Sequence, residues 1–146
     1  MFHLIYSSVA TRDFAADELV ELAARSAANN ASLDITGILL FSEGSFFQVL
    51  EGDAEELDPL FQRIAQDPRH TAVTMVIREP IARRDFADWS MGLSVLSRGE
   101  LMQVPELNDF FATGACLDAL DHGRAKKLLQ AFQAGRWRSS IAARRP

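Results

Sequence analysis

Neutral hydrogen-bonding side chains stand inside apolar stretches of this sequence. Gln48 is the clearest example, because it alternates with Phe46 and Leu50 along a predicted strand. Buried polar groups of this kind must be paired, and an amide offers both a donor and an acceptor. The group comprises Tyr6, Asn29, Asn30, Gln48 and the indole of Trp89. Such a set is suited to the edge of a planar ligand on which donors and acceptors alternate.

The ligand class stays open on the residues alone. A flavin, a nucleobase and a pterin each present an edge of that kind, and the side-chain types do not choose among them. Any one of these polar groups, taken alone, is explained by pairing with its neighbours or with backbone. Taken together, Tyr6, Gln48 and the two asparagines favour one pocket between a helix and a sheet.

A charged pair, Arg63 and Asp67, lies four residues apart on the second predicted helix. That spacing places them one turn apart, where they form a surface ion pair of little energetic value. They are alternatively placed to hold the polar tail of the same ligand. On spacing alone the surface ion pair is favoured.

Most catalytic signatures are missing from the sequence. It contains no P-loop, no G-x-G-x-x-G, no Ser/His/Asp order, no clustered carboxylates and no zinc-type spacing. A small enzyme of acylphosphatase-like shape is the weakest interpretation. Arg12 follows the first predicted strand, but the rest of a phosphate-binding loop is lacking. We therefore expect a protein that is not an enzyme and holds no metal.

Length and charge restrict the remaining classes. The chain has 146 residues and a formal charge of −5, which fits one domain and opposes a nucleic-acid partner. Its only basic cluster is the segment Arg136–Pro146. One cysteine, Cys116, excludes an intramolecular disulfide and fits a reducing cytoplasm. We expect no signal peptide and no membrane span.

Hydrophobic periodicity predicts an alternation of strands and helices. Ala15 is a poor capping residue for the first helix, and Pro59 favours a start of the second helix at Asp58–Pro59. A kinked helix with a first turn capped by Asp53 is the alternative. The predicted strands span 2–7, 35–41, 46–51, 72–81 and 89–96, and the first helix spans 16–30. The inward stripe of that helix includes Asn29 and Asn30.

This order predicts an α+β fold, a ferredoxin-like βαββαβ sandwich with an added fifth strand. We expect a core over residues 1–97, a C-terminal helical cap over 98–137 and a basic, flexible tail over 138–146. The cap is predicted as one short helix and one longer one, which pack on the open sheet face or form a dimer surface. On the last predicted strand, alternation places four apolar residues on one face: Trp89, Met91, Leu93 and Val95.

Several motifs together resemble the BLUF family, which senses blue light using FAD. The motifs are "LIYSS" at Leu4–Ser8, Asn29 and Asn30 before "ITGILLF", "FFQVLEG" at Phe46–Gly52, "RIAQDPRH" at Arg63–His70 and "WSMG" at Trp89–Gly92. They follow one another at the family's spacing over about residues 2–96. The departures are minor: Ala15 replaces a common capping serine, Pro59 interrupts the second helix, and Asp34 stands where many relatives have glycine.

The resemblance implies roles for the polar group. Tyr6 matches the photoactive tyrosine that gives an electron and a proton to the excited flavin. Gln48 matches the glutamine between that tyrosine and the flavin, which changes orientation or tautomer and red-shifts the absorption. Asn30 matches the residue at the C4 carbonyl and N3 edge of the ring, and Asn29 its neighbour near the C2 side.

Further positions carry over in the same way. Arg63 and Asp67 match residues near the ring and the ribityl chain. Ser26 and Ile64 match pocket-lining positions on the two helices. Met91 and Trp89 match the residues that pass the change to the sheet and cap, and which of the two faces the glutamine differs between family structures.

The last third of the chain resembles the helical cap of short, stand-alone members of the family. The resemblance therefore implies an unidentified downstream protein partner or a homo-oligomer formed through the sheet face or the C-terminal helices. A ferredoxin-like ligand-binding or assembly domain without photoactivity, its amides paired internally, is the alternative. A bound yellow chromophore distinguishes the two.

Overall fold

A computed structural model describes residues 1–138 and 141 of the chain. Two single 3-10 turns, η1 (Pro105–Leu107) and η2 (Leu117–Ala119), interrupt the C-terminal helices. The strands are β1 (Phe2–Ala10), β2 (Thr36–Ser42), β3 (Ser45–Gly52), β4 (His70–Pro80) and β5 (Gly92–Val95). The α-helices are α1 (Ala16–Ala31), α2 (Ala54–Ala65), α3 (Arg98–Leu101), α4 (Asn108–Ala112) and α5 (His122–Gln133).

The strands form one sheet in the order β4-β1-β3-β2-β5. Neighbouring strands are antiparallel except β2 and β5, which run parallel. The first four strands and the two helices between them give the ferredoxin-like βαββαβ arrangement. The α+β prediction, with an added fifth strand at the sheet edge, is confirmed.

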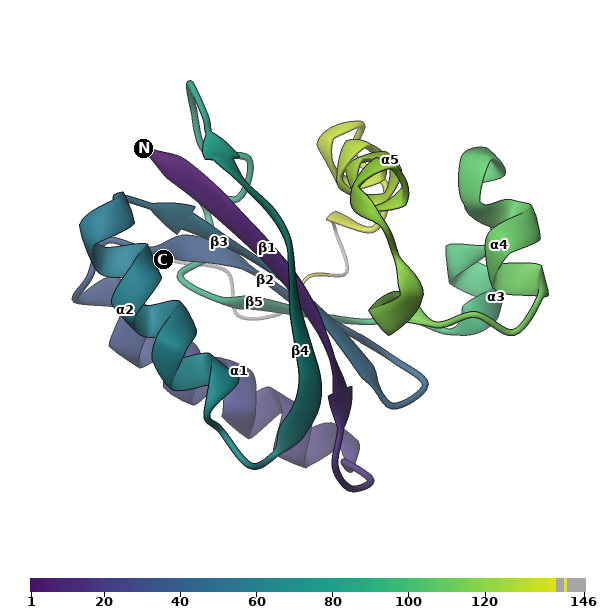
Figure 1. Cartoon of the computed structure of the whole chain (residues 1–146), viewed down its shortest axis with the longest axis horizontal. Helices are drawn as coiled ribbons and strands as arrows, with labels where there is room; N and C mark the ends of the chain where they lie inside the picture. The colour runs from purple at the N-terminus through teal and green to yellow at the C-terminus, as the bar shows by residue number, and fades with distance from the viewer. Residues whose placement is uncertain (139–140, 142–146) are drawn as a thin grey trace.

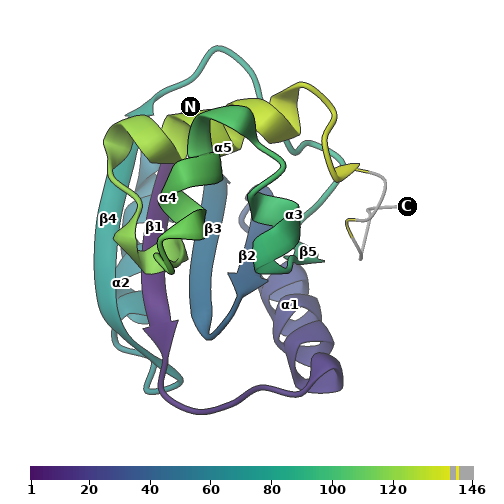
Figure 2. The same ribbon diagram turned by 90° about the vertical axis from the view of Figure 1, so that its right-hand side faces the viewer.

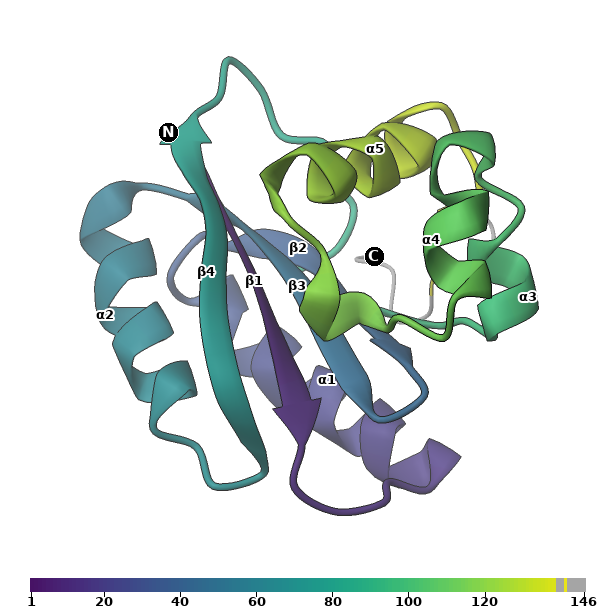
Figure 3. The same ribbon diagram turned by 45° about the vertical axis from the view of Figure 1, so that its right-hand side comes forward.

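Helices cover both faces of the sheet (Figure 1). One face carries α1 and α2, and the other carries α3, α4 and α5, which we call the cap. Figure 2 looks onto the cap, where α5 crosses the ends of the strands, and Figure 3 shows the sheet between the two helical layers. Leu4, Tyr6 and Leu50 belong to the core under α1 and α2, whereas Ile5 and Val49 belong to the core under the cap. Alternation along each strand produces this division.

The hairpin between β2 and β3 matches its prediction closely. Glu43 and Gly44 have φ angles of 47° and 78°, and two positive φ values in a two-residue loop suit the twist of the flanking strands. Before β2, Asp34 also has a positive φ of 53°, a conformation that glycine adopts without strain. At the start of α1, Glu18 accepts from the Ala15 backbone N–H at 3.0 Å, which compensates for the poor cap.

The second helix begins at Ala54, so the predicted start at Asp58–Pro59 is wrong. Asp53 is the N-cap residue, and its carbonyl accepts from the Leu57 N–H at 2.9 Å. Burial of Leu57 anchors the first turn against the sheet. Pro59 lies on the exposed side of the helix. The missing N–H therefore leaves a carbonyl that water can satisfy.

The cap holds more pieces than the two helices predicted, because two short helices and two 3-10 turns precede α5. Leu128, Leu129 and Phe132 of α5 are buried against the open sheet face, as expected. The predicted flexible tail falls mainly on residues 139–140 and 142–146, which lie outside the described residues. Within residues 1–138 and 141, none of the helices combines the length and apolar character that crossing a membrane requires.

The structure explains why the "ITG" stretch has glycine at position 37. A Cβ added there lies 1.8 Å from the Val49 carbonyl oxygen, and backbone cannot move aside as a side chain can. We expect Gly37→Ala to lower the free energy of unfolding by about 3 kcal/mol, measured by urea unfolding. Gly123→Ala is the matched control, since its added Cβ lies 3.7 Å from Asp121 Oδ1. Equal urea midpoints for Gly37→Ala and the parent contradict this account.

Candidate functional site

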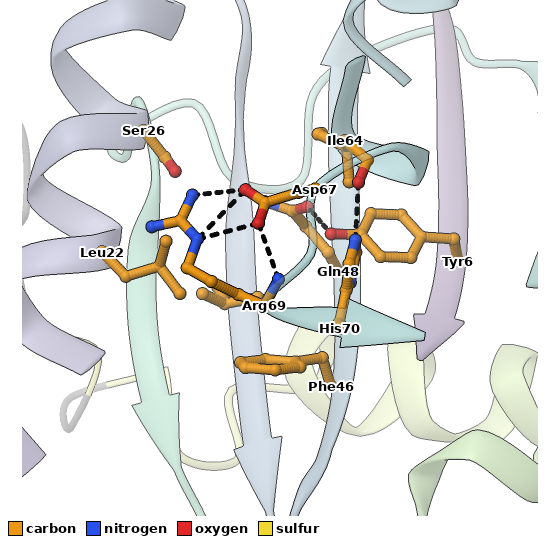
Figure 4. Close-up of a pocket in the computed structure, with 10 residues that line it drawn as sticks. Tyr6, Leu22, Ser26, Phe46, Gln48, Ile64, Asp67, Arg69 and His70 are labelled. Atoms are coloured by element: carbon orange, nitrogen blue, oxygen red, sulfur yellow. Dashed lines mark hydrogen bonds and ion pairs between the residues drawn. The ribbon is translucent and has the colours of Figure 1, made fainter. Parts of the chain in front are cut away.

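A pocket opens between α1, α2 and the sheet (Figure 4). Its walls combine apolar side chains with a few polar groups, which is the usual character of a small-molecule site. The lining residues are Tyr6, Leu22, Ser26, Leu39, Phe46, Gln48, Ile64, Asp67, Arg69 and His70. The structure thus brings together five residues that the sequence analysis singled out: Tyr6, Ser26, Gln48, Ile64 and Asp67.

Tyr6 and Gln48 form a hydrogen-bonded pair at the floor of the pocket. They are directly opposite each other on β1 and β3, and both are nearly inaccessible to solvent. The Tyr6 hydroxyl donates to Gln48 Oε1, as Figure 4 shows. Burial, with the nearby charge of Asp67, raises the pKa of the Tyr6 phenol. The phenol therefore holds its proton at neutral pH and acts as a donor.

Met91 continues this chain of contacts. Gln48 Nε2 donates to Met91 Sδ at 3.2 Å, and the Met91 side chain is fully buried. Thioether sulfur is a weak acceptor, so this end of the amide is held less strongly than the end at Tyr6. Both ends of the buried amide are nonetheless paired in this orientation.

Trp89 lies on the opposite side of the sheet from Met91. It belongs to the core under the cap, with its ring 5.1 Å from the Arg138 guanidinium and 6.4 Å from the Phe86 ring. The predicted single face for Trp89, Met91, Leu93 and Val95 is therefore wrong, and Val95 is exposed. β5 begins only at Gly92, so the alternation of a strand does not extend back to Trp89.

The two asparagines at the end of α1 differ in their burial. Asn30 is buried, and its Nδ2 donates to the Ser90 carbonyl at 3.2 Å. Asn29 is exposed, which corrects its predicted place in the buried stripe. Leu22, one heptad before Asn29, is itself only half-buried, and adjacent helical residues point about 100° apart.

Asp67 pairs with Arg69 rather than with Arg63. Its Oδ1 accepts from Arg69 Nε and from the Arg69 backbone N–H, each at 2.9 Å. The hydrogen bonds from Arg69 hold the pKa of Asp67 below its ordinary value. Arg63 is exposed and does not line the pocket. Both interpretations of an Arg63–Asp67 pair assumed a common helix, but α2 ends at Ala65.

His70 closes the pocket beside the Tyr6 ring. Its Nε2 donates to the Ile64 carbonyl, which only accepts, and its Nδ1 lies 2.7 Å from Ser8 Oγ. The geometry therefore places a proton on Nε2, and the Ser8 hydroxyl pairs with Nδ1. Sequence analysis did not single out Arg69 and His70, although both lie inside the "RIAQDPRH" stretch. A cation two residues after an acid at a helix end was the available signal.

The donors and walls of this pocket fit a flavin. The Gln48 amide and the Tyr6 phenol are hydrogen-bonding groups in the wall, whereas Asn30 does not line the pocket. Leu22, Leu39 and Phe46 supply apolar surface for a flat ring. Arg69 adds a cation within the same pocket. Among the described residues, no three His, Cys, Asp or Glu side chains gather as ligands for a metal ion.

The family profile described as "Sensors of blue-light using FAD" matches residues 1–92. The chain belongs to this family, BLUF. It is therefore a blue-light sensor domain with FAD as its cofactor.

Known relatives agree with this membership. The chain is 38% identical over 107 residues to the photoactivated adenylate cyclase subunit beta of Euglena longa, covering 73% of this chain and 12% of that protein. It is 34% identical over 90 residues to the blue light- and temperature-regulated antirepressor BluF of Escherichia coli strain K12, covering 62% of this chain and 22% of that protein. The chain thus spans only a small part of the curated relatives that it matches.

Solved structures of similar length have the same fold. The dark-state structure of the BLUF protein BlrB superposes with a TM-score of 0.73 at 33% identity, over 91% of this chain and 95% of that one. The photo-activated state of BlsA superposes with a TM-score of 0.78 at 24% identity, over 92% and 96% of the two chains. The likeness to BlrB extends beyond residue 92 and includes the cap.

Proposed function

We propose that Tyr6, Gln48 and Met91 form the light-driven hydrogen-bond switch of this sensor. The observation that carries the proposal is the buried chain from the Tyr6 hydroxyl through the Gln48 amide to Met91 Sδ. A glutamine in an apolar strand is costly unless both ends of its amide are paired. Here both ends are paired, and the two partners differ in strength.

Around the switch, the chain's own residues hold the cofactor. We place Asn30 at the hydrogen-bonding edge of the flavin, because it is buried at the end of α1. Ser26 and Ile64 line the pocket from the two helices. Asn29 and Arg63 are exposed, so we place them at the rim, Asn29 near the C2 side of the ring and Arg63 near the ring and the ribityl chain. Asp67 is held by Arg69, and this pair limits the pocket on the α2 side.

FAD, when bound, supplies the absorption of blue light and an excited ring that accepts an electron and a proton. Tyr6 is the donor in our proposal, since its phenol is protonated and its O–H points at the Gln48 amide. Loss of that proton removes the bond that holds Gln48 Oε1, until Tyr6 takes back the electron and the proton. The amide is then free to change its orientation or tautomer, because Met91 Sδ binds it only weakly.

The energy available to the switch is that of one buried polar group. A mispaired buried amide costs roughly 1–3 kcal/mol. An energy difference of that size shifts a two-state equilibrium by about tenfold or more. This is sufficient to change how Met91 and the adjoining β5 pack.

For the output, we propose a path from Met91 through β5 to the cap, and from the cap surface to a separate protein or to a second copy of the chain. β5 is hydrogen-bonded to β2 and leads directly into α3, so a change at Met91 reaches both layers. We propose no catalytic turnover for the chain itself, because the switch restores its starting state in darkness.

An absorption spectrum of the purified protein, taken in darkness and again after blue light, tests the proposal. We expect a flavin spectrum that shifts reversibly to longer wavelength. A flavin spectrum that does not move contradicts the switch at Tyr6 and Gln48 while leaving the pocket intact. A colourless protein that also refuses added FAD favours the assembly-domain alternative, with its amides paired internally.

A further inference from the structure

The position of Met91 is not fixed by the sheet. β4 ends at Pro80 and β5 begins at Gly92, so Met91 closes a connecting segment without regular secondary structure. We call residues 81–91 the connecting loop. β5 itself contributes only four residues. Whatever orients Met91 toward Gln48 must therefore act on the connecting loop.

Glu51, at the end of β3, holds the beginning of that loop. Its side chain is completely buried and, by alternation from Gln48, lies on the cap side of the sheet. Oε2 accepts from the Asp85 backbone N–H at 2.6 Å, and Oε1 accepts from the Phe86 backbone N–H at 3.0 Å. Oε1 also accepts from the Thr36 hydroxyl at 2.9 Å.

Arg84 holds the backbone around Glu51 from the loop side. Its Nη1 donates to Thr36 Oγ1 at 2.8 Å and to the Glu51 carbonyl at 3.2 Å, and its Nη2 donates to the Asp34 carbonyl at 2.7 Å. The guanidinium group of Arg84 is therefore in direct contact with the backbone of Glu51. Burial raises the pKa of Glu51, while the donors that converge on it favour the carboxylate form.

Further contacts carry this anchoring along the loop to Met91. The Trp89 N–H donates to the Phe86 carbonyl at 3.0 Å, and the Trp89 carbonyl accepts from the Gly37 N–H at 2.9 Å. The Ser90 carbonyl accepts from Asn30. Phe86, which Glu51 holds directly, is thus linked by one turn to Trp89, and the Trp89 and Ser90 carbonyls that precede Met91 are held by Gly37 and Asn30.

The cap contacts the same point of the loop from its other side. Gln133 Nε2 donates to Asp85 Oδ2 at 2.9 Å, and Arg138 Nη2 donates to the Asp85 carbonyl at 2.7 Å. Asp85 is therefore held by β3 through Glu51, by the cap through Gln133 and by Arg138 beyond the end of α5. A shift of the connecting loop therefore changes contacts with β3 and with the cap.

We propose that Glu51 is a positioning residue that keeps Met91 against Gln48 and so sets the lifetime of the light-induced state. This inference rests on the proposed function, because it concerns the return of the Gln48 switch. Glu51 does not line the pocket, and the hydrogen bonds described for its side chain go to Thr36, Asp85 and Phe86. Its effect must pass through the connecting loop.

A carboxylate is required by the geometry of the donors. Two of them are backbone N–H groups, which cannot be turned into acceptors. In Glu51→Gln, an amide NH₂ replaces one oxygen and faces a donor, so one hydrogen bond to a charged group is lost. With the loop less firmly held, the buried Met91 side chain packs less closely against Gln48, and the amide turns back more readily. We expect return to the dark spectrum to be about tenfold faster.

The test is the rate of dark recovery after a blue-light flash, with flavin content and thermal unfolding measured on the same samples. Glu55→Gln is the matched control, because Glu55 is exposed in the first turn of α2, and it should recover within about twofold of the parent. Thr36→Val is the milder companion if Glu51→Gln does not fold. It removes one donor to Glu51 and should change recovery in the same direction by about threefold.

A double-mutant cycle with Met91→Leu separates positioning from a general loss of stability. If Glu51 acts through Met91, Glu51→Gln changes recovery by less than about twofold in the Met91→Leu background. An undiminished tenfold effect in that background overturns the proposed route. Recovery within about twofold of the parent for both Glu51→Gln and Thr36→Val overturns the role of Glu51 itself. A parent without any reversible shift instead overturns the proposed function.

Discussion

Tyr6→Phe is expected to bind FAD to the same extent as the parent but to show no red-shifted state after blue light. The sequence has one tyrosine, and its hydroxyl donates to Gln48 inside the pocket. A phenyl ring keeps the apolar contacts with Phe61 but has no proton to give. The measurement is the dark-minus-light difference spectrum. We expect a loss of the whole shift, not a reduction.

Trp89→Phe is the control for Tyr6→Phe, because tryptophan is the other redox-active aromatic in the chain. Trp89 lies under the cap, on the far side of the sheet from Gln48. We therefore expect Trp89→Phe to keep a reversible shift of parental size. A full photocycle in Tyr6→Phe, or its loss in Trp89→Phe alone, would reassign the donor.

Stability distinguishes loss of chemistry from loss of structure in Tyr6→Phe. Removing the hydroxyl leaves Gln48 Oε1 without its buried donor, at a cost of roughly 1–3 kcal/mol. A protein of this size tolerates that cost, since native domains are stable by about 5–15 kcal/mol. Thermal unfolding of the FAD-bound variant should therefore remain cooperative.

The fold was predictable where period and turn chemistry agreed. Alternating apolar residues, with Glu43 and Gly44 between them, define a hairpin whose register follows from the loop length. Local sequence patterns gave a wrong helix boundary where burial of other residues in the helix determined its start. Leu57 and Leu60 extend α2 toward its N-terminus despite Pro59, because packing of the helix face outweighs the propensity of one exposed residue.

Alternation was also extended too far at the last strand. The sequence pattern continues without a break to Trp89 and therefore predicts that Trp89 shares the face of Met91. A period of two applies only while the backbone is extended, and the turn that ends at Trp89 changes the direction of its side chain. No residue in 81–91 predicts that turn as clearly as Gly44 predicts the hairpin.

The candidate site was predictable from polar residues in apolar positions, but its rim was not. Tyr6, Gln48 and Asn30 are buried as expected, since a buried polar group is conspicuous in its own sequence context. Asn29 and Arg63 are exposed, because rim positions depend on where each helix ends. The role of Glu51 was not predictable for a related reason. Its partners are backbone N–H groups from a distant loop, and no sequence pattern marks these.

Gln48→Leu should bind FAD and yet fail to give the red shift, because leucine has no amide whose orientation can change. In the parent, the Gln48 side chain joins Tyr6 to Met91 by a hydrogen bond at each end of its amide. Leucine fills a similar volume and suits a position flanked by Phe46 and Leu50 on the same face. The folded state should therefore persist, and the difference spectrum measures the switch alone.

Gln62→Leu provides the matched control for Gln48→Leu, because the same exchange then falls on the exposed side of α2. That variant should keep the full reversible shift. In Gln48→Leu the Tyr6 hydroxyl loses its acceptor, so any remaining electron transfer has no amide to reorient and nothing to pass to Met91. A red shift of parental size in Gln48→Leu would show that the light-induced change does not run through the amide, and the path from Tyr6 to β5 would then have to be sought along the strand backbone.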